Sequence, residues 1–139
     1  MALQFSDLLR NARLDAILTL LGDYPVLRIR SGDPPAALED EDTGDILVEY
    51  TLADGWWAAA VGGVKALTSS IPATDAIATG TAGHFRIYAE DPSGDVAHLQ
   101  GTTSEAGGGG DMILGSVSIE AGKSVAITSF TLTDGNAGG

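Results

Sequence analysis

The chain of 139 residues contains no cysteine. This absence excludes disulfide bonds and thiolate metal sites, and it fits folding in a reducing compartment. Basic residues are scarce as well, because seven Lys and Arg stand against 19 Asp and Glu, which gives a net charge of −12. A charge of this sign repels phosphate backbones and anionic lipid headgroups. We therefore expect neither nucleic acid nor a membrane as a partner.

Long apolar runs are also missing. No segment approaches the roughly 20 apolar residues that a membrane-spanning helix needs. The N-terminal segment lacks the pattern of a secretory signal, because Arg10, Arg13 and Asp15 interrupt its apolar residues. With 44% hydrophobic residues and 19 glycines, the composition indicates a soluble, loop-rich globular chain that favours β-structure. Its length fits a single domain.

One segment has the periodicity of an amphipathic helix. Ser6 is a favourable N-cap and Asp7 follows in the first turn, so we predict a helix over residues 7–21. Its apolar stripe consists of Leu14, Ile17, Leu18 and Leu21. We expect this stripe to pack against the rest of the chain, and docking onto another subunit is the alternative. Residues 1–24 then form an N-terminal arm and residues 25–139 the main domain.

Beyond residue 25 the apolar pattern changes to a period of two, which predicts short β-strands. We expect 84–88 and 96–103 to form a hairpin, and a β-bulge near Ser129, where the parity of the apolar residues changes. About eight short strands separated by turns indicate a mainly β fold, a jelly-roll-like β-sandwich with the helix outside. The predicted strands are 26–30, 46–52, 84–88, 96–103, 112–114, 117–119 and 125–133, with weaker candidates at 64–67 and 76–78.

No arrangement of residues typical of a catalytic site is present, and we expect no enzymatic activity and no cofactor. His84 and His98 could share a metal ion if the hairpin brought them together, but no further ligands stand at a recognisable spacing. Asp40, Asp42 and Asp45 could bind calcium, although their spacing does not match an EF-hand. We therefore predict no metal site, and a solvated acidic loop at 39–45.

A run of four glycines occupies residues 107–110. A phosphate-binding loop would need a Lys and a hydroxyl residue after its glycines, whereas Asp111 follows here. We interpret the run as a flexible hairpin, or as a place where a neighbouring backbone approaches closely.

Trp56 and Trp57 are adjacent, in a segment whose secondary structure the sequence does not decide. In a strand, adjacent side chains point to opposite faces, so one indole could enter the core and the other could remain at the surface. An exposed indole could stack on a sugar ring or bind at a protein interface. Burial of both is the simpler interpretation.

Four segments resemble small structural proteins of tailed bacteriophages. They are LLRNARLDAI (8–17), LRIRSGDPPA (27–36), GTAGHFRIY (80–88) and GGGGDM (107–112). The size, the acidity and the expected sandwich are most similar to those of head decoration or cement proteins. This resemblance implies a virion protein on the capsid surface, made in the bacterial cytoplasm. The implied partners are the major capsid protein and further copies of this chain, as a dimer or trimer.

Arginine and tryptophan commonly anchor protein interfaces. We therefore predict that the contacts of such a protein include Arg10, Arg13, Arg28, Arg30, Trp56 and Trp57. The alternatives are a carbohydrate-binding or receptor-binding module that uses a tryptophan as its platform, and a connector of the tail or neck. The number of copies in the virion distinguishes these roles.

Overall fold

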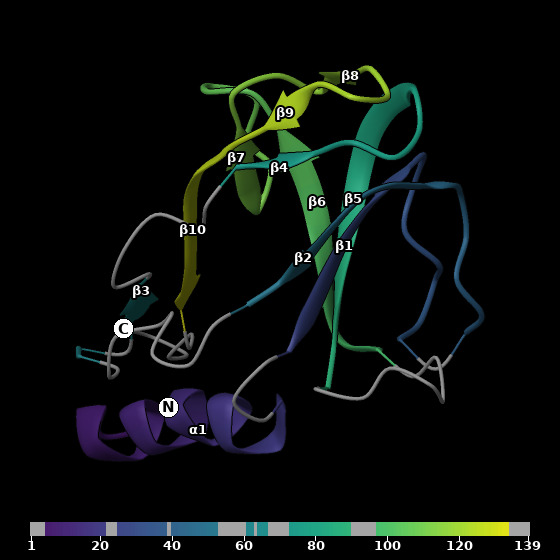
Figure 1. Ribbon diagram of the computed structural model, residues 1–139. Helices are drawn as coiled ribbons and strands as arrows, with labels where there is room; N and C mark the ends of the chain where they lie inside the picture. Colours follow the sequence, from purple (N-terminus) through teal and green to yellow (C-terminus); the bar gives the residue numbers. More distant parts are fainter. Residues whose placement is uncertain are drawn as a thin grey trace.

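The computed structural model describes residues 5–21, 25–38, 40–52, 61–62, 64–66, 73–89 and 97–133. The fold is mainly β with one N-terminal helix, as predicted (Figure 1). The helix is α1 (Asp7–Leu21), as the sequence predicts. The strands are β1 (Val26–Ser31), β2 (Ile46–Thr51), β3 (Val64–Ala66), β4 (Thr74–Asp75), β5 (Gly80–Tyr88), β6 (Ala97–Ser104), β7 (Met112–Leu114), β8 (Ser118–Ile119), β9 (Ser124–Val125) and β10 (Ile127–Thr133).

Most of the described strands belong to one curled sheet in the order β2-β1-β5-β6-β7-β10-β3, with β8 paired to β5. The strands β4 and β9 form a separate two-stranded ladder. The predicted hairpin of 84–88 with 96–103 is confirmed, because β5 and β6 pair in antiparallel register with His84 opposite Thr102. The long strand β5 therefore lies at the centre of the sheet, between β1 and β6.

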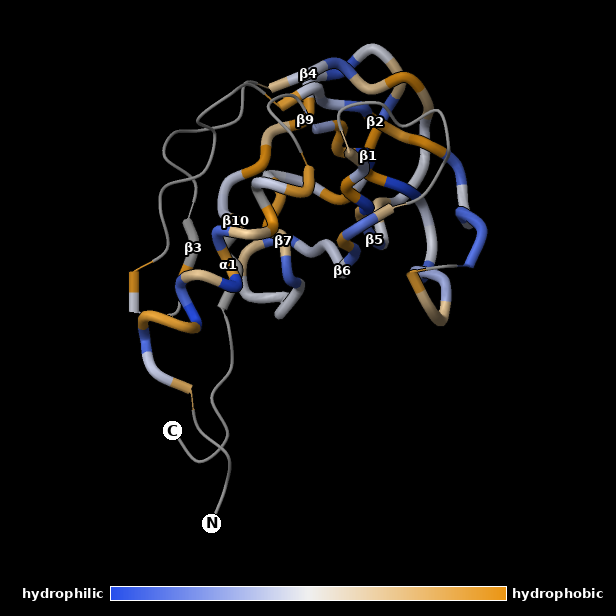
Figure 2. Tube along the Cα trace, turned by 90° about the horizontal axis from the view of Figure 1, so that it is seen from below, coloured by the Kyte–Doolittle hydropathy of each residue, from blue (hydrophilic) through white to orange (hydrophobic). Residues whose placement is uncertain are grey.

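The helix begins where the sequence predicts because Ser6 caps it. The backbone N–H of Leu9 donates to the Ser6 hydroxyl oxygen (3.2 Å), which satisfies one of the unpaired donors of the first turn. Leu14 and Leu21 are buried, and Leu21 belongs to the main core, which confirms that part of the stripe packs inward. Figure 2 shows α1 and β3 on one side of the molecule and β1, β2 and β5 on the other.

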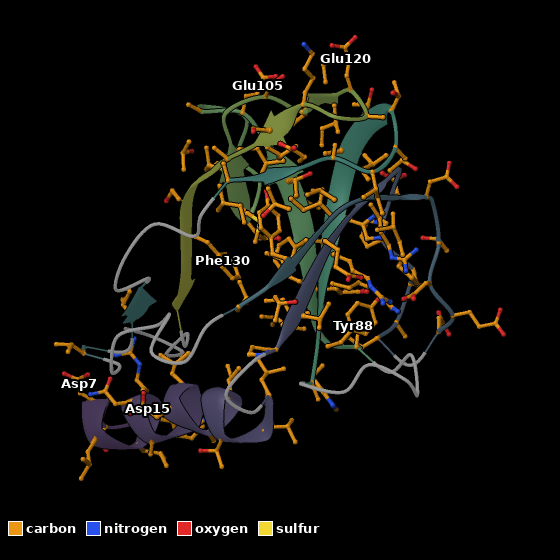
Figure 3. All side chains as sticks on the ribbon, viewed as in Figure 1. Asp7, Asp15, Tyr88, Glu105, Glu120 and Phe130 are labelled. Atoms are coloured by element: carbon orange, nitrogen blue, oxygen red, sulfur yellow. The ribbon has the colours of Figure 1, made fainter. Side chains whose placement is uncertain are left out.

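The core lies on one face of the curled sheet. Leu27 is opposite Ile87, and Ile29 is opposite Phe85, in the register of β1 with β5. Because side chains alternate along a strand, all four lie on the same face, and all four are buried. The Phe85 ring meets Phe130 of β10 edge to face, with 5.1 Å between ring centroids. Figure 3 shows Phe130 pointing from β10 into the interior.

The strand predicted at 76–78 is wrong. The backbone N–H groups of Ile77 and Ala78 both donate to the Leu47 carbonyl (2.8 and 3.4 Å), so the chain crosses the edge of β2 instead of pairing along a strand. The nearby strand is β4, which lies just before this crossing. The bulge predicted near Ser129 is confirmed, because the register of β10 against β7 shifts between Ile127 and Ser129.

The glycine run does not form a hairpin, because β6 and β7 are parallel. The connecting loop returns to the start of β7 through close backbone packing, which was the alternative interpretation. A Cβ on Gly110 would lie 2.7 Å from the backbone nitrogen of Ser104, so only glycine fits without a shift. The Asp111 carboxylate then accepts from the backbone N–H of Thr102 (3.0 Å), which fixes the end of the loop.

Candidate functional site

The face of the sheet opposite the core carries polar and charged side chains in two cross-strand rows. Because the pleat has a period of two, residues that pair directly across neighbouring strands lie on the same face. Like charges directly opposite one another destabilise a sheet, so two facing arginines require nearby anions. The first row is Glu49, Arg28, Arg86 and Gln100, and the second includes Arg30, His84 and Thr102.

Residues 32–38 and 40–45, here called the strap, cover these rows. Ser31 and Asp45 close the strap at its base, since the N–H of Ser31 donates to the Asp45 carbonyl (3.1 Å) and the N–H of Asp45 donates to the Ser31 hydroxyl (3.0 Å). Gly44, at φ 71°, lies against the Ser31 carbonyl, where a side chain would collide. The strap therefore closes at a fixed point next to β1.

Arg86 is fully buried beneath the strap. A buried guanidinium costs several kcal/mol unless it is paired and its donors are satisfied, so the number of its partners is decisive. It donates to the Gln100 side-chain oxygen (3.0 Å), to the Asp42 carboxylate (2.7 Å), and to the carbonyls of Ala37, Leu38 and Asp40 (3.2 Å each). Four of these five acceptors belong to the strap, so Arg86 holds the strap to the sheet.

Asp42 is the anion at the centre of this cluster. One carboxylate oxygen accepts from Arg86 (2.7 Å) and from the Tyr88 hydroxyl (2.7 Å), and the other accepts from Arg30 (2.9 Å). Burial alone would raise the pKa of Asp42, but the hydrogen bonds from Tyr88 and Arg86 and the charges of both arginines outweigh it and lower that pKa. In Figure 3 the Tyr88 side chain lies between the strands and the strap.

His84 lies fully buried in the second row, directly opposite Arg30. Its Nδ1–H donates to the Gly32 carbonyl (2.8 Å), because a carbonyl oxygen can only accept, so Nδ1 carries a proton. Burial lowers the pKa of His84, and the charges of Arg30 and Arg86 lower it further against the opposing effects of the Gly32 bond and Asp42. The Nε2 atom has no hydrogen-bond partner among the described residues, so protonation would bury an N–H that none of them accepts.

We expect the free energy of unfolding to fall as the pH is lowered. Because the pKa of His84 is lowered in the folded chain, the unfolded chain binds a proton below pH 6.5 that the folded chain does not bind. The free energy of unfolding therefore decreases below that pH. The lowered pKa of Asp42 stabilises the folded chain above pH 3.8. This stabilisation is lost as the pH falls through the lower pKa that Asp42 has in the folded chain. Urea unfolding at several pH values between 7 and 5 measures the histidine part.

Two histidine variants test whether His84 causes this pH dependence of stability. His84→Gln should make the free energy of unfolding depend less on pH between pH 7 and 5. His98→Gln is the control, because His98 is exposed, and it should leave that dependence unchanged. An unchanged slope in His84→Gln would remove His84 as its source.

Two of the arginines predicted for an interface are engaged inside the fold. Arg30 is buried and bound to Asp42 and the Gly44 carbonyl, so its guanidinium is not offered to a partner as expected. Arg28 donates to Glu49 (2.7 Å) and lies 4.8 Å from the centre of the Tyr88 ring. Each of these two arginines is therefore paired with a carboxylate of the same chain, Arg28 with Glu49 and Arg30 with Asp42.

The other predicted interface residues lie elsewhere. Arg10 and Arg13 both belong to α1, where Arg10 pairs with Asp7 (3.1 Å) and Arg13 lies 4.9 Å from the centre of the Phe5 ring. Trp56 and Trp57 lie outside the described residues. The four predicted residues that the structure describes are therefore divided between α1 and β1.

The structure contradicts the two metal hypotheses considered for the sequence. His84 is opposite Thr102, which is four residues along β6 from His98, or about 13 Å at the rise of a strand. Both carboxylate oxygens of Asp42 are bound to side chains on the sheet, so Asp42 points away from the exposed Asp40 and Asp45. Within the described part of the chain, no group of three or more His, Asp or Glu residues could hold a metal ion.

Exposed apolar side chains gather at one end of the molecule. Val61 and Val64 exchange two backbone hydrogen bonds (2.9 and 3.0 Å) in a tight turn, and β3, which follows, contacts α1. Figure 2 shows apolar segments of α1 beside this turn. We call α1 together with this turn the apolar end. Of six exposed large apolar residues among those described, five belong to it: Leu8, Leu9, Leu20, Val61 and Val64.

Comparisons with known proteins add no relative. No protein-family model matches the chain, and neither a curated protein nor a solved structure matches it. Among the described residues, no helix has the length and apolar character needed to cross a membrane.

Proposed function

We propose that this chain is a structural protein of a tailed-bacteriophage virion, a decoration or cement protein that binds the outer surface of the capsid lattice and stabilises it. The apolar end carries the proposal, because contiguous exposed apolar patches mark sites of protein association. The rest of the molecule is strongly acidic, with a net charge of −12 for the chain. On a lattice, many modest contacts combine into strong attachment.

A decoration protein needs a rigid fold rather than a catalytic cleft. The buried cluster of Arg86, Asp42 and Tyr88 supports such a role, because it holds the strap to the sheet. Arg86, Asp42 and Tyr88 use their polar atoms on one another and on the strap, so their chemistry stabilises the fold. The four segments that resemble phage structural proteins include Arg28, Arg30, His84 and Arg86 of this cluster. Non-enzymatic binding is the activity that this arrangement favours.

A jelly-roll-like sandwich is part of the proposal. Two contacts support a second layer facing β2, β1 and β5 across the core. The buried Tyr50 hydroxyl of β2 donates to the Val125 carbonyl of β9 (2.6 Å), and Phe85 of β5 packs on Phe130 of β10. In this arrangement β9 and β10 belong to the opposite layer, as in a two-layer β-protein.

The copy number in purified phage particles tests the proposed role. Quantitative mass spectrometry against the major capsid protein should give a number close to the count of capsid subunits. Six or twelve copies would instead indicate a connector, and a handful would indicate a receptor-binding or carbohydrate-binding module. Either of these results would overturn the decoration role.

A variant of the exposed turn tests the proposed surface. Val61→Glu should reduce binding to capsids that lack this protein by tenfold or more, because a carboxylate would be desolvated at the contact. Ile77→Glu is the matched control, since Ile77 is 64% exposed and Val61 is 76% exposed, but Ile77 lies outside the apolar end. Equal binding by both variants, measured by co-sedimentation, would remove this turn from the capsid contact.

A further inference from the structure

The outward face of α1 is mainly apolar, with Arg13 at its edge, whereas its inward side already packs through Leu14 and Leu21. A helix that is apolar on both sides is typical of one covered on both sides. Thr19 is the one uncharged polar residue on this face. The exposed apolar residues of the face are Leu8, Leu9, Ala12, Ala16 and Leu20.

The spacing of this face is close to symmetric about position 14. Ala12 and Ala16 lie two residues on either side of it, and Leu8 and Leu20 lie six residues on either side. A twofold axis perpendicular to the helix at this level would place Ala12 of one copy against Ala16 of the other. It would also bring Leu8 and Leu9 against the Thr19 and Leu20 end. Self-complementarity of this kind is what a twofold contact between identical chains requires.

The charges of α1 also favour a second copy as the occupant. The exposed residues of α1 from Leu8 to Leu20 include no carboxylate, and Arg13 is the one charged side chain among them, although the chain carries a net charge of −12. Two such chains repel wherever their acidic surfaces meet, and this face avoids that repulsion. Asp7 is already paired with Arg10 at the start of the helix. Small residues at the centre let two helix axes approach to about 8 Å.

We propose that α1 packs against α1 of a second copy of this chain, antiparallel and across a twofold axis at the level of Leu14. The pairing itself is independent of the virion role. It covers Leu8, Leu9 and Leu20 of the apolar end, so the turn between Val61 and Val64 is the part of that end that remains for the capsid.

The mass of the purified chain in solution tests the pairing. Sedimentation equilibrium should give twice the chain mass of 14.1 kDa. Leu20→Glu should halve that mass, because it places a carboxylate in the contact. Leu20 is 61% exposed in the single chain, so this variant should keep its circular dichroism spectrum and thermal midpoint. Ile77→Glu, at a residue that is 64% exposed, should stay dimeric.

Two results of this experiment would overturn the pairing: a monomer at every concentration, or a dimer that Leu20→Glu leaves intact. A monomer in solution together with a high copy number in particles would overturn the pairing and leave the decoration role standing. A dimer in solution together with a handful of copies per particle would overturn the decoration role and leave the pairing standing.

The lack of native cysteine allows the orientation to be tested by cross-linking. A mixture of Ala12→Cys and Ala16→Cys chains should form an intermolecular disulfide on oxidation, because facing Cα atoms must lie within about 4.4–6.8 Å. Either variant alone should cross-link at least tenfold less. Strong cross-linking of Ala12→Cys alone would show parallel helices and would overturn the antiparallel arrangement. A mixture that forms no disulfide would also overturn it.

Discussion

Replacing Asp42 with alanine should destabilise the protein by about 3–5 kcal/mol, because removing one partner from a buried ion pair leaves the other charge uncompensated. Here Arg30 and Arg86 both lose their anion, and the Tyr88 hydroxyl loses its acceptor. Arg86 has no exposed surface through which water could replace the carboxylate. Urea unfolding followed by circular dichroism measures the loss as a lower midpoint.

Glu41 provides the control, because it is exposed and adjacent to Asp42 in the strap. Glu41→Ala removes the same charge from the same segment, and its stability should stay within about 0.5 kcal/mol of the unchanged protein. If Asp42→Ala and Glu41→Ala unfolded at the same urea concentration, the strap would be held by its backbone contacts rather than by this carboxylate.

Local patterns in the sequence were sufficient to predict the helix and most of the strands. The helix follows from Ser6 as its cap and from the spacing of Leu14 and Leu21, both of which are properties of neighbouring residues. The bulge near Ser129 follows from a change in parity within one strand. Such features need no knowledge of what lies across the sheet.

The buried cluster depends on pairing between distant segments and was not predicted. Alternation places Arg28 and Arg30 on one face of β1, and His84, Arg86 and Tyr88 on one face of β5, but nothing local shows that these faces coincide. The acidic loop offers several carboxylates, and only the folded strap selects Asp42. A concentration of positive charge on two strands of an acidic chain was the available signal that an acidic segment must cover them.

Of the two interpretations of the glycine run between β6 and β7, the hairpin was wrong for a related reason. A glycine-rich segment between two short strands is typical of a hairpin, yet these strands are parallel. The deciding contacts are the approach of Gly110 to the Ser104 backbone and the bond from Thr102 to Asp111, which form only when the loop folds back. Glycine permits both conformations, so the residue type alone does not choose between them.

Gly83→Ala should destabilise the protein by about 2–5 kcal/mol, from overpacking combined with the loss of a buried hydrogen bond. Gly83 is the extra residue of a bulge in β5, because Arg30 pairs with His84 while Ser31 pairs with Ala82. A Cβ at Gly83 would overlap the Gly32 carbonyl oxygen, and the backbone atoms that it meets cannot move aside as a flexible side chain can. That oxygen is the acceptor of the His84 Nδ1–H. Thermal and urea unfolding measure the loss.

Gly115→Ala is the control, because a Cβ at Gly115 would meet open space and its φ is not positive. Its stability should stay within about 0.5 kcal/mol of the unchanged protein. A Gly83→Ala variant as stable as Gly115→Ala would show that the strap does not need the Gly32 carbonyl held against β5.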